Sequence, residues 1–142
     1  MNDEYDLQRF LDAQEPVFET ALSELRNGRK RSHWMWFVFP QLKGLGHSEM
    51  AQRYGISGRK EALAYLQHPS LGARLERCSS ALLQWRQRSA TDIMGSPDDL
   101  KLRSSMTLFA SVAPHNLLFQ EVIEAFFDGK PDSATVSRLG QG

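Results

Sequence analysis

The residues best suited to ligand chemistry lie between positions 32 and 41, where aromatic and polar side chains are mixed in one short segment. It reads Ser-His-Trp-Met-Trp-Phe-Val-Phe-Pro-Gln and holds two of the three tryptophans of the chain. A small-ligand pocket needs an apolar wall with a few directed polar groups. We therefore expect Trp34 or Trp36 to stack on a planar ligand oriented by polar neighbours, which are His33, Gln41 and Lys43. The alternative is that the rings form hydrophobic core, because large aromatic side chains dominate core burial.

A second group of polar residues falls on a helix predicted for residues 97–112. At about 100° per residue, the apolar face of this helix consists of Leu102, Met106 and Phe109. Asp98 and Ser105 project in the same direction, and Lys101 lies beside them. Polar side chains that face a core need partners or a wet cavity, so these three are candidate pocket residues. Asp98 equally suits the positive end of the helix dipole, and Ser105 could donate to the carbonyl one turn earlier.

The loop of residues 44–48, Gly-Leu-Gly-His-Ser, is a third candidate. It precedes a predicted helix and could present backbone N–H groups to a phosphate. Two glycines near a helix start are equally typical of a turn. The loop also lacks the preceding strand of a dinucleotide fingerprint and the Lys-Ser/Thr end of a P-loop.

Size and composition exclude several classes of function. A chain of 142 residues predicts one domain, residues 1–142. Its formal net charge is zero, which argues against nucleic acid and anionic membranes as partners. The longest apolar run, residues 34–39, is too short to cross a bilayer, and we see no secretory signal. The single cysteine, Cys78, excludes an intrachain disulfide, and the four histidines are not spaced as metal ligands. We expect no metal, no cofactor and a cytoplasmic protein; the sequence does not determine its oligomeric state.

The elements that must position these residues are helical. Apolar spacing predicts helices over residues 7–11, 17–25, 49–54, 58–66, 71–85, 97–112 and 114–128, with a short helix after Asp132. We expect Asp6 to cap the first helix. Residues 32–41 fit either a buried helix that ends before Pro40 or a strand, and the helical neighbours favour the helix. Cys78 lies on an apolar stripe, so we expect a buried structural thiol. We predict an all-α, single compact domain of about seven short helices, with a frayed tail at residues 140–142.

The motifs resemble those of a bacterial family of small uncharacterised domains, some of which carry the name calpastatin-like. The resemblance rests on residues 32–46, 54–56, 68–72 and 99–109 and covers nearly the whole chain. It implies a mostly helical fold and no established activity. More remotely, the order of elements is similar to the NADAR superfamily, whose members are associated with NAD and ADP-ribose chemistry and include N-glycosidases. The Trp-Gly and Gly-x-Asn-x-Leu-Gly patterns of that superfamily are missing here, so no catalytic residue is carried over.

Together the motifs and the resemblance suggest a site for a nucleotide or an ADP-ribose-like molecule, with N-glycosidase activity as the candidate reaction. Breaking an N-glycosidic bond builds positive charge on the sugar, which a nearby carboxylate would stabilise. Asp98 is the first candidate for this carboxylate and Glu49 the second. Lys101, Arg103 or the basic run at residues 29–31 could hold a phosphate. The alternative is a non-catalytic binding or protein-interaction module, in which the aromatic segment is core or an exposed docking patch.

Overall fold

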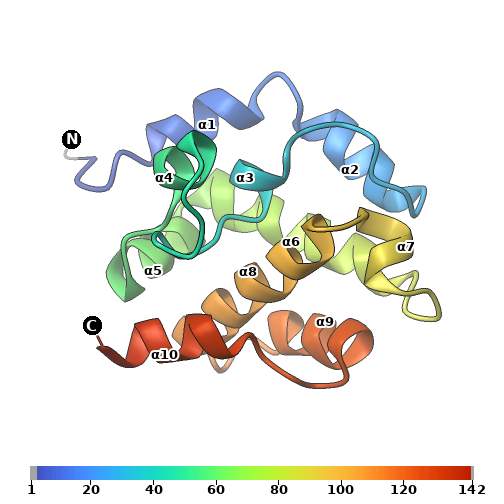
Figure 1. Cartoon of the computed structure of the whole chain (residues 1–142). Helices are drawn as coiled ribbons and strands as arrows, with labels where there is room; N and C mark the ends of the chain where they lie inside the picture. The colour runs from blue at the N-terminus through green and yellow to red at the C-terminus, as the bar shows by residue number, and fades with distance from the viewer. Residues whose placement is uncertain (1–2, 142) are drawn as a thin grey trace.

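Apolar residues at helical spacing form ten α-helices in the computed structural model, which describes residues 3–141 (Figure 1). Seven helices have seven residues or more: α1 (Gln8–Gln14), α2 (Phe18–Arg26), α5 (Arg59–Gln67), α6 (Pro69–Leu83), α8 (Asp98–Val112), α9 (Leu118–Phe127) and α10 (Ser133–Gln141). The three shorter ones are α3 (Met35–Val38), α4 (Glu49–Tyr54) and α7 (Ala90–Met94). The described residues form no strand, only an isolated bridge between Leu42 and Ile56. The prediction of a single compact all-α domain is confirmed.

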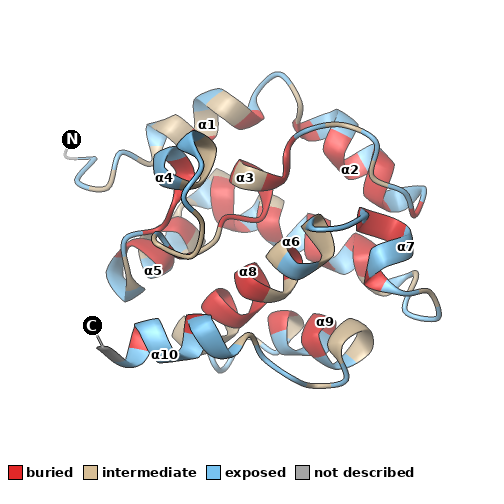
Figure 2. Ribbon diagram, viewed as in Figure 1, coloured by how far each residue is buried: buried red, intermediate tan, exposed pale blue. Residues whose placement is uncertain are grey.

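Helices α6 and α8 form the centre of the core. Helices α2, α5 and α9 pack on α6, while α5, α7, α9 and α10 pack on α8. The buried faces of these helices point towards one another (Figure 2). Gly72 allows the close contact between α5 and α6, because a Cβ at this position would lie 2.1 Å from the carbonyl oxygen of Leu66.

The apolar stripe predicted on α6 is buried, as expected. It consists of Leu71, Leu75, Cys78 and Leu82. Burial raises the pKa of the Cys78 thiol to about 12, so the thiol stays protonated at neutral pH. A neutral, inaccessible thiol is a poor nucleophile, which agrees with a structural role.

Two local predictions need correction. Asp3, not Asp6, caps α1: its carboxylate accepts hydrogen bonds from the backbone N–H groups of Leu7 (2.7 Å) and Gln8 (3.0 Å). These backbone hydrogen bonds lower the pKa of Asp3. The segment 32–41 forms only the single-turn helix α3. Helix α10 is described through Gln141, and Gly142, the last residue of the predicted tail at 140–142, lies outside the described residues.

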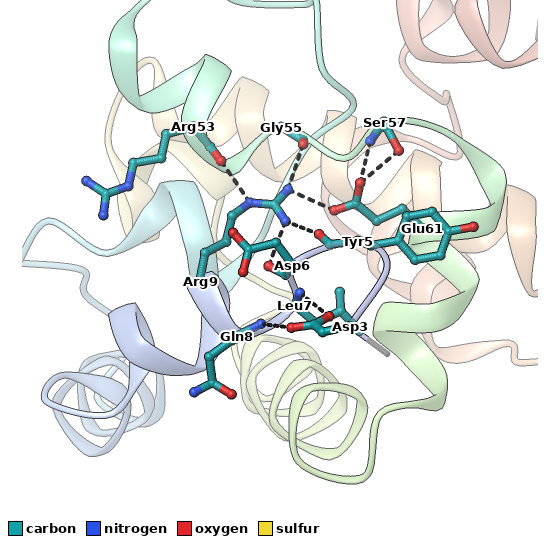
Figure 3. A network of polar contacts seen from close by, with 10 residues as sticks. All are labelled: Asp3, Tyr5, Asp6, Leu7, Gln8, Arg9, Arg53, Gly55, Ser57 and Glu61. Carbon is teal, nitrogen blue, oxygen red and sulfur yellow. Dashed lines mark hydrogen bonds and ion pairs between the residues drawn. The ribbon is translucent and has the colours of Figure 1, made fainter. Parts of the chain in front are cut away.

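A partly buried arginine, Arg9, fixes the N-terminal part of the fold (Figure 3). The Arg9 guanidinium donates to the carbonyl oxygens of Arg53 (2.8 Å) and Gly55 (3.1 Å) and pairs with Glu61 (2.8 Å). It also donates to the carbonyl oxygens of Tyr5 and Asp6. Arg9 therefore joins α1, the end of α4 and the start of α5.

The segment held by Arg9 in turn holds the loop of residues 41–46. Ile56 donates to the carbonyl oxygen of Gln41 (2.8 Å), and Lys43 donates to the carbonyl oxygen of Ile56 (2.7 Å). This loop is consequently attached to the core on one side by backbone hydrogen bonds. It lines both of the pockets described below.

Candidate functional site

The two tryptophans of segment 32–41 have different environments. Trp34 is completely buried, and its Nε1–H donates to Oε1 of Glu24 over 2.8 Å. Trp36, on α3, is partly exposed and lines a groove on the surface. A buried ring with both faces packed has no room for a ligand, so Trp34 belongs to the core. Of the two candidate stacking residues, only Trp36 is accessible.

Glu24 holds the chain around Trp34 in place. Its carboxylate accepts from the backbone N–H groups of Arg31 (2.8 Å) and Ser32 (3.0 Å), from the Ser32 hydroxyl and from Trp34. Burial alone would raise the pKa of Glu24, but these hydrogen bonds outweigh it and lower the pKa to about 2. Glu24 is thus an ionised anchor for the segment that leads into α3.

Residues from both sequence motifs line one groove, with a volume of about 280 Å³. We call it the Trp36 groove. Its apolar lining is made of Trp36, Leu45, Gly46, Pro97, Leu100 and Ala134. Its polar lining is made of Gln41, Lys101, Ser104 and Asp132. The groove therefore has the aromatic wall and the few polar groups expected of a ligand site.

A series of ion pairs extends from Lys101, which lines this groove. The Lys101 ammonium lies 3.6 Å from the centre of the Trp36 ring and 3.4 Å from Asp98. On its other side Asp98 pairs with Lys30 over 2.8 Å. The Lys30 side chain is only 7% exposed, and its ammonium also lies over the Trp34 ring at 4.9 Å. Lys30 is thus a buried partner of Asp98 and not part of a solvated basic run.

This arrangement defines what each charge can do. Asp98 does not line the groove, and two ammonium groups already compensate its charge. It is therefore well placed to position Lys101 and poorly placed to stabilise a cationic sugar. Lys101 keeps further N–H donors and lies against the aromatic wall, so it can bind an anionic group beside a stacked ring.

The remaining predicted site residues are scattered. Gln41 lines the groove, whereas Lys43 lines a different pocket. His33 and Glu49 are exposed and do not line the groove, with Glu49 in the first turn of α4. Ser105 is fully buried, and its hydroxyl has no hydrogen-bond partner among the described residues. The structure therefore brings Trp36, Gln41 and Lys101 together in the groove, and the other predicted site residues do not line it.

Arg103 helps to position Asp132, a groove residue that the sequence did not indicate. Its Nε donates to the carbonyl oxygen of Lys130 (2.8 Å), which fixes the turn before α10. The backbone N–H of Asp132 donates to the Thr107 hydroxyl (2.9 Å), and its carboxylate caps α10 through Thr135. Asp132 is thereby the acidic residue that lines the groove. Only its helix-capping pattern was visible in the sequence.

Two further properties concern the described residues as a whole. None of the helices that they form is both long and apolar enough to span a membrane. Residues 3–141 also contain no cluster of three or more His, Cys, Asp or Glu side chains arranged to bind a metal ion.

A family model described as "Protein of unknown function (DUF1810)" matches residues 4–139. The chain belongs to this family. Neither this match nor the structural comparison lends support to the calpastatin-like name or to the NADAR resemblance. A search of curated proteins finds no match for this DUF1810 domain.

A solved structure is closely similar to this DUF1810 domain. It is the crystal structure of the conserved hypothetical protein Rv1873 from Mycobacterium tuberculosis. The two chains share 53% sequence identity over 97% of this chain and 99% of the other, with a TM-score of 0.95. The whole fold, including the helices around the Trp36 groove, is therefore common to both proteins.

Proposed function

We propose that this DUF1810 domain binds a small molecule of the nucleotide class, with a flat ring and an anionic group, in the Trp36 groove. The observation that carries the proposal is the convergence of Trp36 and Lys101, from separate motifs, on one groove. An aromatic face binds a flat ring, and an ammonium group binds a phosphate or carboxylate. Gln41 provides both a donor and an acceptor for the edge of a base.

The size of the groove limits the ligand. Its volume of about 280 Å³ lies just below the range for small-molecule sites, roughly 300–1,000 Å³. This favours a ligand of mononucleotide size over a dinucleotide enclosed along its full length. A longer molecule such as ADP-ribose would extend out of the groove.

Binding without catalysis is the function that we favour. The charge of Asp98 is compensated by Lys30 and Lys101, and Glu49 is not in the groove. N-glycosidase activity is the second candidate, because one acidic residue, Asp132, lines the groove. In that case Asp132 would take the role of stabilising positive charge on the sugar.

Tryptophan fluorescence and titration calorimetry with AMP, adenosine and ADP-ribose test the proposal. We expect AMP to quench the fluorescence of the native protein, and Trp36→Phe to abolish this quenching. Trp85→Phe is the matched control, because the Trp85 indole donates to the carbonyl oxygen of Leu25, away from the groove. Lys101→Gln should weaken AMP binding about tenfold and adenosine binding less, since only AMP carries the anionic group.

Two results would overturn the proposal. One is the absence of heat and quenching at ligand concentrations of about 10 mM. The other is quenching that survives Trp36→Phe and disappears in Trp85→Phe. Chromatography of the same mixtures tests catalysis: release of free base that is lost in Asp132→Asn but kept in Asp98→Asn would make the protein an N-glycosidase.

A further inference from the structure

A second pocket, which we call the basic pocket, has a volume of about 180 Å³ and lies beside the same loop of residues 41–46. Three cationic side chains line it: Lys43 from the loop, Arg59 from the start of α5 and Arg138 from α10. The remaining lining is Leu42, Ser57, Gly58 and Leu139. The protein has a formal net charge of zero, so three positive charges and no negative one around a single pocket form a local excess. Such an excess attracts anions.

These cations have no acidic partner among the described residues. The ion pairs found among the described residues involve other cations, namely Arg9, Lys30, Arg74 and Lys101. Glu61 hydrogen bonds to the pocket residue Ser57, but Glu61 is itself paired with Arg9 at 2.8 Å. The positive charge of the basic pocket is therefore left uncompensated by described side chains.

The shape of the loop is adapted to one of these cations. A Cβ on Gly44 would lie 2.2 Å from an Nη atom of Arg138 and 2.7 Å from its Cζ. Gly44 also has a φ of +99°, which residues with a side chain rarely adopt. The guanidinium of Arg138 thus packs directly on the backbone of Gly44. This contact holds an otherwise exposed arginine at the edge of the pocket.

Backbone donors add to the positive side chains. Helix α5, of nine residues, begins after Gly58, which has no capping side chain, and the Ser57 hydroxyl is bonded to Glu61. The N–H groups of Arg59 and Lys60 have no hydrogen-bond partner among the described residues. A Cβ on Gly58 would meet nothing within 4 Å, so the space beside this residue at the start of α5 is open. Such donors complement the side chains in binding an oxyanion.

We infer that Lys43, Arg59 and Arg138 form a binding site for a phosphate group, either free or at the end of a small phosphorylated molecule. Three separate segments supply the charges, and the contact with Gly44 orients Arg138. The proposal does not depend on a ligand in the Trp36 groove. Because the side chains are exposed and solvated, we expect a dissociation constant of the order of 1 mM for inorganic phosphate.

An amide NMR titration of the full chain with inorganic phosphate, against sodium chloride at equal ionic strength, tests this inference. We expect saturable shifts of Gly44, Gly58, Arg59 and Lys60 with phosphate alone. A parallel titration with glycerol phosphate separates the two sources, since tighter binding of the ester assigns the site to a phosphorylated molecule. Both patterns support the site.

Variants make the test specific. Arg138→Gln should weaken phosphate binding at least about fivefold. Arg59→Gln should do the same, and it serves as the second variant if the loss of the Gly44 contact disturbs the fold. The matched control is Arg86→Gln, an exposed arginine whose Nε donates only to the carbonyl oxygen of Leu83, and it should leave binding unchanged.

Three results would overturn the inference. The first is a set of shifts that do not saturate or that chloride reproduces, which would indicate only screening. The second is unchanged affinity in both Arg138→Gln and Arg59→Gln. The third is binding of a short single-stranded oligonucleotide without any response to inorganic phosphate, which would assign the pocket to a nucleic-acid surface instead.

Discussion

Replacing Arg9 with methionine tests whether one side chain holds the framework of both pockets. The substitution keeps an alkyl stem that can pack on Phe10, above which the guanidinium lies at 4.3 Å. It removes the ion pair with Glu61 and the hydrogen bonds to the carbonyl oxygens of Arg53 and Gly55. The Glu61 side chain, only 4% exposed, is left without a cation.

The expected cost follows from this burial. Removing one partner of a buried ion pair costs about 3–5 kcal/mol, and the Arg9 side chain is 16% exposed, so we expect about 3 kcal/mol. For a domain of 142 residues this corresponds to a fall in Tm of roughly 6–12 °C. The double variant Arg9→Met/Glu61→Gln should cost less than the sum of the single variants by about 1–3 kcal/mol.

Urea unfolding and thermal unfolding of the four proteins in this cycle provide the measurement. Arg53→Met is the control, because Arg53 is exposed and only stacks on Tyr54 at 5.4 Å, which should contribute less than about 1 kcal/mol. Amide exchange should also accelerate at Ile56, which bonds to the loop of residues 41–46. A cost below about 1 kcal/mol for Arg9→Met, or a coupling near zero, would refute the reasoning.

Two further changes should affect stability at residues that line neither pocket. Glu24 has a folded pKa of about 2, below its ordinary value of 4.5, so its contribution is complete above pH 4.5 and is lost as the pH falls towards 2. Glu24→Gln should therefore lower the free energy of unfolding by about 1–3 kcal/mol at pH 7, and the variant should lose less stability than the native protein between pH 5 and 2. Equal acid sensitivity of the two proteins would contradict this. Ser105→Ala removes a buried hydroxyl that has no hydrogen-bond partner among the described residues. It should raise the free energy of unfolding by up to about 1 kcal/mol and leave AMP binding unchanged. A clear destabilisation would show that the hydroxyl has a partner.

The long helices could be predicted because their signals are local. On α6 the spacing of Leu71, Leu75 and Cys78 already places all three on one face, and all three are buried. Segment 32–41 could not be predicted in the same way. Its path depends on distant contacts, chiefly the hydrogen bonds to Glu24. Such contacts leave no periodic pattern, so a strand remained as the alternative to the favoured helix.

The candidate site was partly predictable, because some of its residues lie on one long helix. The helical geometry of α8 correctly associated Asp98 with Lys101, which now form an ion pair. The sequence could not separate Trp34 from Trp36, since both are large rings in the same segment and only tertiary packing exposes one of them. Nor could it place Asp132 in the groove, because that requires the chain to turn after α9 and run back along α8.

Chemistry identifies the candidate sites better than size does. Two larger surface grooves, of about 450 and 460 Å³, lie over α6 and α9. Both are lined by charges of opposite sign, with Glu76 beside Arg77 in one and Glu121 beside Arg86 in the other. Neither has an aromatic wall. The Trp36 groove and the basic pocket are smaller, but the groove has an aromatic wall beside its charged residues and the basic pocket has charges of one sign only. Both are lined by the loop of residues 41–46 and by α10, so a ligand response there should first be sought in the amides of Gly44 and Gly46.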